Sequence, residues 1–441
     1  MGKKLVCCAV GAAILATAGL AQAAGLKINE QGAKAMGMAN AFVAQADDPT
    51  ALYYNPAGIA YLKGAQVNMG SLLISVPETK FSGTTALSGS SPVEEEAKKD
   101  LFIAPSLYAT YSLERIPLTF GLGINSIYPL AKSWDDSSAF RNQVQNIAVK
   151  PVNFQPTVAY LFEDWNLAVA AGLDVTHAIV TLSRSVYVPD PTNPGTPAEL
   201  GIMGLDGTAT DFGYNFGLMW KPIKELSFGA SYRSEVTLHV DGASNFLATT
   251  QAGAAAIGQS ANFNSYNSRL RATSKFTSDI TLPDDLNLGV AWHPNDAWVV
   301  EFDADRTGWS SIDKLLFSFN NTQFNNFNNQ PIETKWKDAW CYRLGGQYSY
   351  NKNVDLRAGY AYDTNPIPSS SLGPMLPDAD RHNVSIGMGL HNDYATLDLA
   401  YMWVHWLNRT VANQDAATLT GENGSFKSDA HLFGANVTIK F

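Results

Sequence analysis

Long stretches of this chain alternate strictly between apolar and polar residues, which is the pattern of β-strands with two different faces. The alternation is strict over residues 431–441, 226–240, 354–363 and 384–391. At the C-terminus, one face holds His431, Phe433, Ala435, Val437, Ile439 and Phe441, and the other holds Leu432, Gly434, Asn436, Thr438 and Lys440. In segment 226–240, the apolar face is expected to hold Leu226, Phe228, Ala230, Tyr232, Val236, Leu238 and Val240, with Arg233, Glu235 and His239 opposite. One face suits lipid and the other a polar lumen.

The extended segments and their connections predict a membrane barrel. The segments run to about ten residues or more, which is the length that a tilted strand needs to cross a bilayer. Short turns lie near 114–117, 163–166, 222–226, 294–297, 351–353 and 392–394, and longer polar segments near 77–100, 131–146, 189–207, 241–272, 320–334, 365–380 and 411–427. Short turns that alternate with long loops are typical of bacterial outer-membrane proteins. We therefore predict an all-β membrane protein, a 14-stranded antiparallel outer-membrane β-barrel over residues 65–441.

The segment 24–64 does not follow the alternating pattern. Its centre predicts a short helix, because Asp48 is a good N-cap residue and Pro49 fits the first turn. The following Asn55-Pro56-Ala57-Gly58 ends that helix, because a proline disfavours helical conformation in the residue before it. A fourteen-stranded barrel encloses more space than its own side chains fill, so we expect segment 24–64 to lie inside it as a hatch.

The N-terminal residues 1–23 read as a secretory signal peptide. Lys3 and Lys4 precede an apolar run that ends before Ala21-Gln22-Ala23, a small-residue cleavage site. Beyond this run, no stretch approaches about 18 consecutive apolar residues, which excludes membrane-spanning helices. The formal net charge of −10 argues against a nucleic-acid partner. Cys341 is the one cysteine outside the signal segment, so no internal disulfide is expected.

Charged and titratable residues on the strands read as structural. We expect the charges of both signs on the lumen face to pair across the lumen and with the hatch, since buried charges need partners; they are Arg233, Glu235, Glu301, Asp303, Asp305, Arg343 and Arg357. The seven histidines are scattered singly, and none is accompanied by a serine motif. The sequence therefore predicts no enzyme, no cofactor and no metal site.

Several short motifs, in this order along the chain, resemble the FadL family of outer-membrane transporters for long-chain fatty acids and other hydrophobic compounds. They are Ala24-Gly25-Leu26, Asn55-Pro56-Ala57, Tyr232-Arg233-Ser234-Glu235-Val236, Leu282-Pro283, Trp309-Ser310, Lys337-Asp338-Ala339-Trp340 and Pro377-Asp378-Ala379-Asp380-Arg381. The resemblance implies a fourteen-stranded barrel with an N-terminal hatch, an outer low-affinity groove and an inner high-affinity pocket. It also implies an exit through the wall where the third strand kinks.

The third strand carries residues that suit such a lateral gate. Pro129 cannot donate to a ladder, and Gly121 and Gly123 weaken one, so a kink near Ser126 is physically reasonable. A proline that simply ends the strand is the other reading.

The resemblance also implies substrate-binding residues. Arg184 is similar in position to the arginine that holds the substrate carboxylate in fatty-acid members, and a rim arginine facing lipopolysaccharide or solvent is the alternative. Leu26 resembles an apolar residue that contacts substrate. The family's partner lysine aligns near Ile332, and Lys335 is the nearest basic residue.

The expected function is uptake of long-chain fatty acids or related hydrophobic compounds by passive, ligand-gated lateral diffusion. A channel for neutral hydrocarbons or aromatics with the same fold, and a surface receptor or adhesin, stay open as alternatives. We expect a single chain in the outer membrane of a Gram-negative bacterium, in contact with membrane lipid and lipopolysaccharide.

Overall fold

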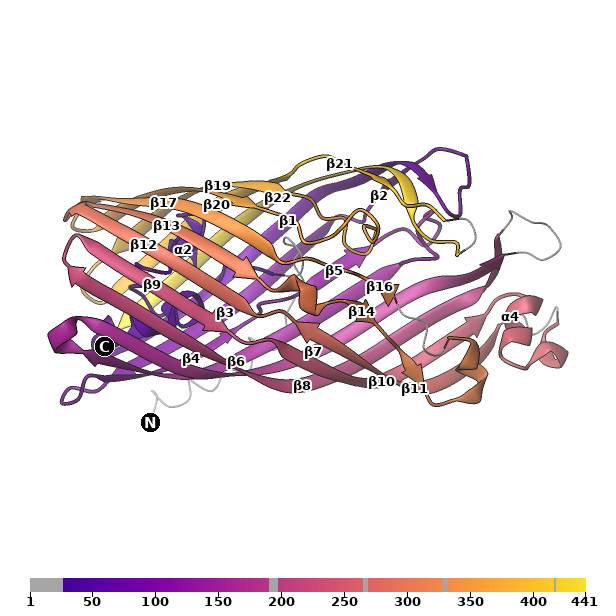
Figure 1. The fold of residues 1–441 in the computed structure, drawn as a ribbon, viewed down its shortest axis with the longest axis horizontal. Coiled ribbons are helices and arrows are strands. Elements are labelled where there is room, and N and C mark those ends of the chain that lie inside the picture. Colours follow the sequence, from indigo (N-terminus) through magenta and orange to yellow (C-terminus); the bar gives the residue numbers. More distant parts are fainter. Residues whose placement is uncertain (1–26, 190–196, 265–268, 328–331, 416–417) are drawn as a thin grey trace.

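The computed structural model describes residues 27–189, 197–264, 269–327, 332–415 and 418–441, so the predicted signal segment and Leu26 lie outside the described residues. The fold is a closed antiparallel barrel of 14 strands, as the alternation predicts. Figure 1 shows tilted strands, short turns at the left-hand end and long loops at the right-hand end. No helix in the described ranges is long and apolar enough to span a membrane.

Most crossings of the barrel are single strands. These are β1 (Ala65–Thr85), β3 (Asp100–Ser112), β6 (Asn146–Phe162), β7 (Leu167–Pro189), β8 (Pro197–Ile223), β13 (Trp298–Thr307), β17 (Ala339–Asn351), β18 (Val354–Asp363), β19 (Arg381–His391), β20 (Ala395–Trp406) and β22 (Glu422–Lys440). The other crossings each consist of two strands: β4 (Leu118–Asn125) with β5 (Leu130–Ser133), β9 (Leu226–Arg233) with β10 (Val236–Ala248), and β12 (Asp285–Asn295) with β11 (Leu270–Leu282). The barrel closes through a ladder between β1 and β22, from Gln66 opposite Lys440 to Thr85 opposite Glu422.

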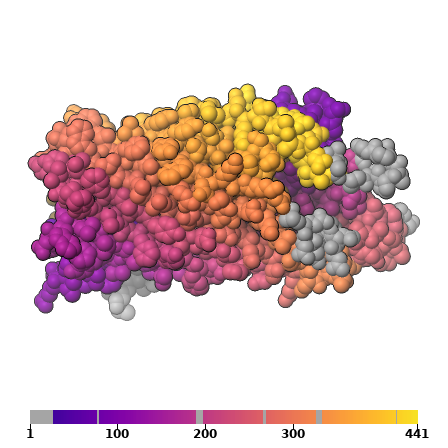
Figure 2. Space-filling model, viewed as in Figure 1, coloured from indigo at the N-terminus to yellow at the C-terminus, as the bar shows by residue number. Residues whose placement is uncertain are grey.

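The long connections carry short elements of their own. They are β2 (Val93–Glu96), α4 (Gln251–Ala256), η3 (Ser260–Asn262), η4 (Trp309–Ser311), β14 (Lys314–Leu315), β15 (Ser318–Phe319), η5 (Thr322–Phe327), β16 (Ile332–Glu333) and β21 (Arg409–Ala412), while η2 (Glu163–Trp165) lies in a short turn. The polar segment expected at 241–272 is largely strand at its ends, since β10 continues to Ala248 and β11 begins at Leu270. On the face seen in Figure 2, the wall hides the hatch, and the loops gather at the right-hand end beside α4.

Exposed aromatic side chains mark the membrane band on the outer surface. One group lies beside the short turns and includes Trp165, Trp220, Trp292, Trp298 and Tyr394. A second group lies farther up the strands and includes Tyr214, Trp340, Tyr342, Tyr360 and Trp403. Aromatic girdles flank the apolar band of outer-membrane barrels, and in such barrels the short turns face the periplasm and the long loops face outward.

The hatch (residues 27–64) lies inside the short-turn half of the barrel (Figure 1). It contains α2 (Ala33–Met36), α3 (Ala51–Tyr54) and the 3₁₀ helix η1 (Pro56–Tyr61). Helix α3 begins at Ala51, so the expected start next to Asp48 is wrong. Asp48 instead folds the preceding turn, because its Oδ1 accepts the backbone N–H of Thr50 at 2.7 Å.

The expected faces of segment 226–240 are wrong above Arg233. Val236, Leu238 and Val240 are buried in the lumen instead of facing lipid, whereas Glu235 is exposed. The cause is the break between β9 and β10 at Ser234 and Glu235, because a one-residue shift in a strand exchanges its two faces.

Glycines in the wall let the hatch backbone approach closely, and this makes a test of hatch docking. A Cβ added at Gly359 of β18 would lie 2.2 Å from the carbonyl carbon of Met38. We expect Gly359→Val to displace the hatch and to cost about 1–3 kcal/mol of stability, the usual range for overpacking. Limited proteolysis of the detergent-solubilised protein should then cleave within residues 27–64.

Gly346→Val is the matched control, because its added Cβ would meet one atom within 4 Å, the carbonyl oxygen of Val299 at 3.8 Å. Equal protease resistance of both variants and the native chain would show that this close approach does not hold the hatch.

Candidate functional site

The Asn55-Pro56-Ala57-Gly58 motif fastens the lower part of the hatch. The side chain of Asn55 accepts the N–H of Ala57 and donates to the carbonyls of Val43, at 2.8 Å, and Leu218, at 3.0 Å. A Cβ added at Gly58 would lie 2.2 Å from the carbonyl oxygen of Ala46, so this position needs glycine. Asn55 thereby joins the hatch to strand β8 of the wall.

Two carboxylates of β13 hold the centre of the hatch. Asp303 Oδ2 accepts the backbone N–H groups of Phe42 (2.8 Å) and Val43 (3.1 Å), and Glu301 accepts those of Ala44 (2.6 Å) and Gln45 (2.9 Å), all buried. Buried polar groups of the backbone need partners, and the barrel supplies them here.

Other lumen charges are paired, as the sequence predicts. Arg343 contacts Asp305 at 2.6 Å and donates to the carbonyl of Ala39 at 3.0 Å, and Arg357 contacts Asp398 at 2.7 Å. Arg343 thus joins the hatch backbone to the wall, whereas the pair of Arg357 with Asp398 links strands β18 and β20.

The third crossing breaks at residues 126–129, which we call the third-strand break. The ladder between β3 and β4 ends where Leu107 faces Ile124, and β5 forms a ladder with β6 and not with β3 within the described residues. Residues 100–106 of β3 therefore have a ladder partner on the β1 side only. Ser126 and Pro129 lie in this break, whereas Gly121 and Gly123 lie below it in the paired part of β4.

The N-terminal limb of the hatch lies on this break. The N–H of Ile28 donates to the carbonyl of Ile127 at 2.8 Å, and Gln31 Nε2 donates to the carbonyl of Ser126 at 2.7 Å. Next to them, Lys27 forms a buried ion pair with Asp285 at 2.6 Å. The residues that cover the break therefore belong to the start of the hatch.

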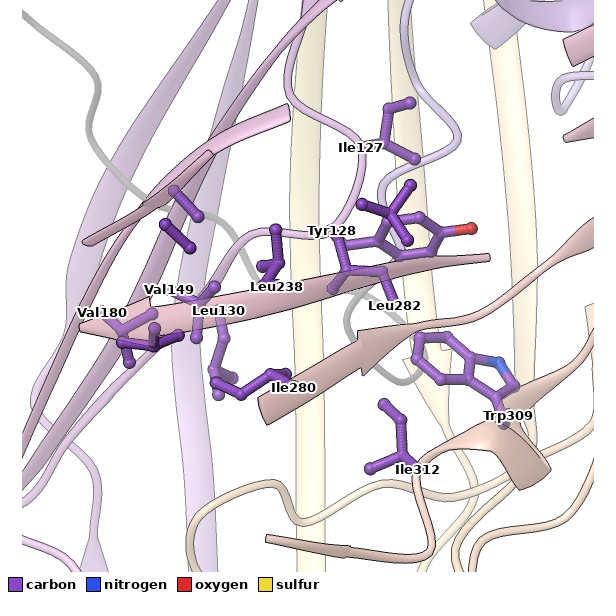
Figure 3. Packing of buried hydrophobic residues seen from close by; sticks show 14 of the residues in the cluster. Ile127, Tyr128, Leu130, Val149, Val180, Leu238, Ile280, Leu282, Trp309 and Ile312 are labelled. Atoms are coloured by element: carbon purple, nitrogen blue, oxygen red, sulfur yellow. The ribbon is translucent and has the colours of Figure 1, made fainter. Parts of the chain in front are cut away.

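Three strand breaks meet around a small cavity above the hatch, which we call the junction cavity. It is lined by Ile127, Tyr128, Pro151, Asn153, Asp174, Thr176, Arg233, Ser234, Val236 and Leu282. Figure 3 shows Tyr128 beside Leu282, with Trp309 nearby, and the Tyr128 hydroxyl donates to the carbonyl of Pro283 at 3.1 Å. Arg233 and Asp174 form an ion pair at its polar side.

Above the junction cavity, the inside of the barrel is apolar. A single cluster of buried hydrophobic side chains extends from the hatch to the outer loops. It includes Val180, Met203, Leu205, Leu238, Phe246, Ile257, Phe276, Ile280, Ile312 and Phe324. Helix α4 contributes Ala254 to the same cluster at the loop end. This lining suits a hydrophobic solute and not a hydrated one.

Arg184 lies on the lumen face of β7, at the level of the apolar cluster. Ala178 and Val180 are buried on the lumen face, and Arg184 lies on the same face because it follows them at an even number of residues. Its partner in the ladder is Met203, which is also buried. Within the described part of the chain, no hydrogen bond or ion pair engages its side chain. This guanidinium is therefore available for an anionic group.

The structure does not bring Lys335 to Arg184. Lys335 is exposed, has a positive φ of 50°, and forms an ion pair with Glu333 at 3.0 Å. Leu26 lies outside the described residues. The residues that sequence reasoning missed are Tyr128, Val236 and Leu282, whose inward position depends on the strand breaks. Pro129 next to Tyr128 and Pro283 next to Leu282 are the sequence signals that mark breaks beside them, and no such signal accompanies Val236.

Comparison with known proteins agrees with this architecture. The family described as outer membrane protein transport protein (OMPP1/FadL/TodX) matches residues 14–441 of this chain. The long-chain fatty acid transport protein of Escherichia coli O6:H1 is 25% identical over 453 residues, which cover 98% of this chain and 97% of that protein. Outer membrane protein P1 of Haemophilus influenzae (strain Rd) is 24% identical over 473 residues, with 97% and 98% covered.

Solved structures show the same fold. A Pseudomonas aeruginosa FadL homologue has a TM-score of 0.82 at 19% identity, covering 95% of this chain and 100% of its own. The Pseudomonas putida toluene transporter TodX has a TM-score of 0.67 at 16% identity, covering 92% and 98%. The chain therefore belongs to the OMPP1/FadL/TodX family of outer-membrane transport proteins.

Proposed function

We propose that this protein takes up long-chain fatty acids or related hydrophobic compounds by passive diffusion through the barrel and out through its wall at the third-strand break. One observation carries this proposal: a continuous apolar lumen ends at that break, and the N-terminal limb of the hatch lies on it. Names of related proteins agree with it, since they include long-chain fatty acid transport proteins and a toluene transporter.

In this proposal, the solute enters between the outer loops and moves along the apolar lining to the junction cavity. Burial of about 0.8 kcal/mol per methylene supplies the attraction without an energy source. The solute then displaces the limb that carries Lys27, Ile28 and Gln31. The centre of the hatch stays in place, because Glu301 and Asp303 hold four consecutive N–H groups.

Arg184 favours the proposal that the solute carries a carboxylate, because its guanidinium faces an otherwise apolar lumen. The position of Lys335 favours the second candidate, a channel for neutral hydrocarbons, because that lysine is exposed and paired with Glu333. We further propose that residues 1–23 are removed and that 24–64 form the hatch. Because the chain closes its own barrel, we propose that it acts as a monomer among outer-membrane lipid and lipopolysaccharide.

Restoring the third strand tests the lateral route. Residues 126–129 face 150–152 of β6, so the break holds one residue more than its partner. Deleting Pro129 should allow a continuous strand, and we expect it to remove most fatty-acid uptake by cells that lack their own transporter.

Pro156→Val is the control, because Pro156 is an exposed proline in an intact ladder opposite Leu122. If cells with the Pro129 deletion take up fatty acid at the native rate, the third-strand break is not the exit.

Replacing Arg184 tests the class of solute. Loss of a charge-assisted hydrogen bond costs about 1.5–3 kcal/mol, so Arg184→Ala should weaken fatty-acid binding about tenfold to a hundredfold. Uptake of a matched alkylbenzene should not change. Arg271→Ala is the control, because Arg271 is exposed near the outer end of β11. Equal effects of Arg184→Ala on the acid and on the neutral compound would favour the hydrocarbon channel.

A further inference from the structure

The barrel wall has a second interruption, between β8 and the β9/β10 crossing. The lower ladder ends where Asn215 faces Arg233, and the upper ladder begins where Thr208 faces Asp241. Between these pairs, residues 209–214 of β8 and 234–240 have no ladder with each other, although both segments keep ladders with their other neighbours along most of their length. We call this interruption the β8–β10 slit.

The slit has a clear structural cause. Strand β8 runs straight through this level, whereas the neighbouring crossing shifts by one residue at its break, so the two strands cannot stay in register. An ordinary bulge inserts one residue and then resumes pairing at once. Here one backbone bond follows the lower ladder, from the N–H of Ser234 to the carbonyl of Tyr214 at 2.9 Å, and no ladder then joins 209–213 to the neighbouring crossing until Thr208 faces Asp241.

Side chains take the place of the missing strand pairing. The Ser234 hydroxyl accepts the N–H of Tyr214 at 3.0 Å, and Asp211 Oδ2 accepts the N–H of His239 at 2.9 Å. Val236 covers the lower part of the slit on the lumen side, because a Cβ added at Gly213 would lie 2.7 Å from Val236 Cγ2. Side chains on single bonds can rotate aside, whereas a backbone ladder cannot open without breaking several bonds at once.

The slit lies between the lumen and the outer surface, with apolar side chains on both faces of the wall and a polar contact between Asp211 and His239 (3.0 Å) across it. On the inside, Ser234 and Val236 line the junction cavity together with Ile127 and Tyr128 of the third-strand break. On the outside, Phe212 is 71% exposed and stands next to the aromatic band that contains Tyr214. A hydrophobic solute in the junction cavity therefore faces two interruptions of the wall.

We propose that the β8–β10 slit is a second lateral opening for the hydrophobic solute, with Val236 against Gly213 as its closure. This inference rests on the proposed transport function. The slit differs from the third-strand break in its relation to the hatch. Among the described residues, no hydrogen bond or ion pair joins the hatch to 209–214 or 234–240, whereas Ile28 and Gln31 bond directly to the third-strand break. The slit thus opens without movement of the hatch limb.

A reversible cross-link tests the slit. The Cβ of Gly213→Cys would lie next to that of Val236→Cys, within the spacing of a disulfide. The native Cys341 is buried and does not compete. Uptake of a labelled long-chain fatty acid is measured with and without reductant, in the native background and in the Pro129 deletion. Each single-cysteine variant is the matched control.

In the Pro129-deletion background, we expect fatty-acid uptake by the oxidised double variant to fall to the level of vector-only cells. Uptake should recover on reduction. Equal uptake by the oxidised and reduced forms in both backgrounds would show that the slit is not an opening. The proposed exit at the third-strand break would not be affected by that result. If native and vector-only cells take up the acid equally, the proposed function itself fails.

A labelling experiment tests the slit without relying on uptake. Val236→Cys is exposed to an alkyl maleimide dissolved in the membrane, and Leu205→Cys is the control. Leu205 is buried in the same apolar cluster, but its strand is paired on both sides, with Leu182 and Ser244. We expect Val236→Cys to react faster, and equal rates would mean that the slit stays closed to membrane solutes.

Discussion

A β-strand has only two faces, and this barrel needs opposite polarities at its two ends. Around the hatch, the wall must be apolar toward lipid and polar toward the lumen. Farther toward the outer loops, the lumen is apolar and polar residues such as Lys275 and Asp279 of β11 are exposed on the outside. The β9/β10 crossing makes this change by a break, so that Ser231 and Arg233 face inward below it and Val236 and Leu238 face inward above it. A break is thus one way in which a strand whose sequence keeps alternating can meet this change of polarity.

The breaks also decide where the wall is continuous. In the neighbouring β9/β10 and β11/β12 crossings the breaks coincide, so Arg233 faces Asp285 below and Val236 faces Leu282 above in one unchanged register. Strand β8 changes the polarity of its lumen face without a break, because its inward residues change from polar to apolar along the sequence. Asn215 faces inward below the level of the breaks, and Met203 faces inward above it. An unbroken strand next to a broken one can lose part of its ladder, as β8 does at 209–213 and β3 does beside β5, whereas β6 keeps ladders with both β4 and β5.

The barrel and its strand number could be predicted because alternation and loop length are local properties of the sequence. The inward position of Val236 could not, because alternation continues through Ser234 and Glu235 and no proline marks that break. The third-strand break was predictable from Pro129, whereas the roles expected for Gly121 and Gly123 remain predictions. Both glycines lie in paired strand, and a Cβ at Gly121 would meet Leu52 of the hatch at 2.5 Å. Local sequence shows where a strand is weak, but its neighbour decides whether the wall opens there.

The proposed lateral release of a solute depends on the hatch and the breaks together. Each backbone group left unpaired in lipid costs several kcal/mol, so an intact ladder is a poor place for an opening. At the third-strand break and at the β8–β10 slit, backbone groups are already bonded to side chains or to the hatch, as Ser126 is to Gln31 and His239 is to Asp211. Separating such pairs forfeits about 0.5–1.5 kcal/mol for each neutral hydrogen bond, somewhat more for a charged one, and burial of a few solute methylenes offsets that amount. In the proposed mechanism, passage is therefore confined to the places where a change of strand register has already interrupted the wall.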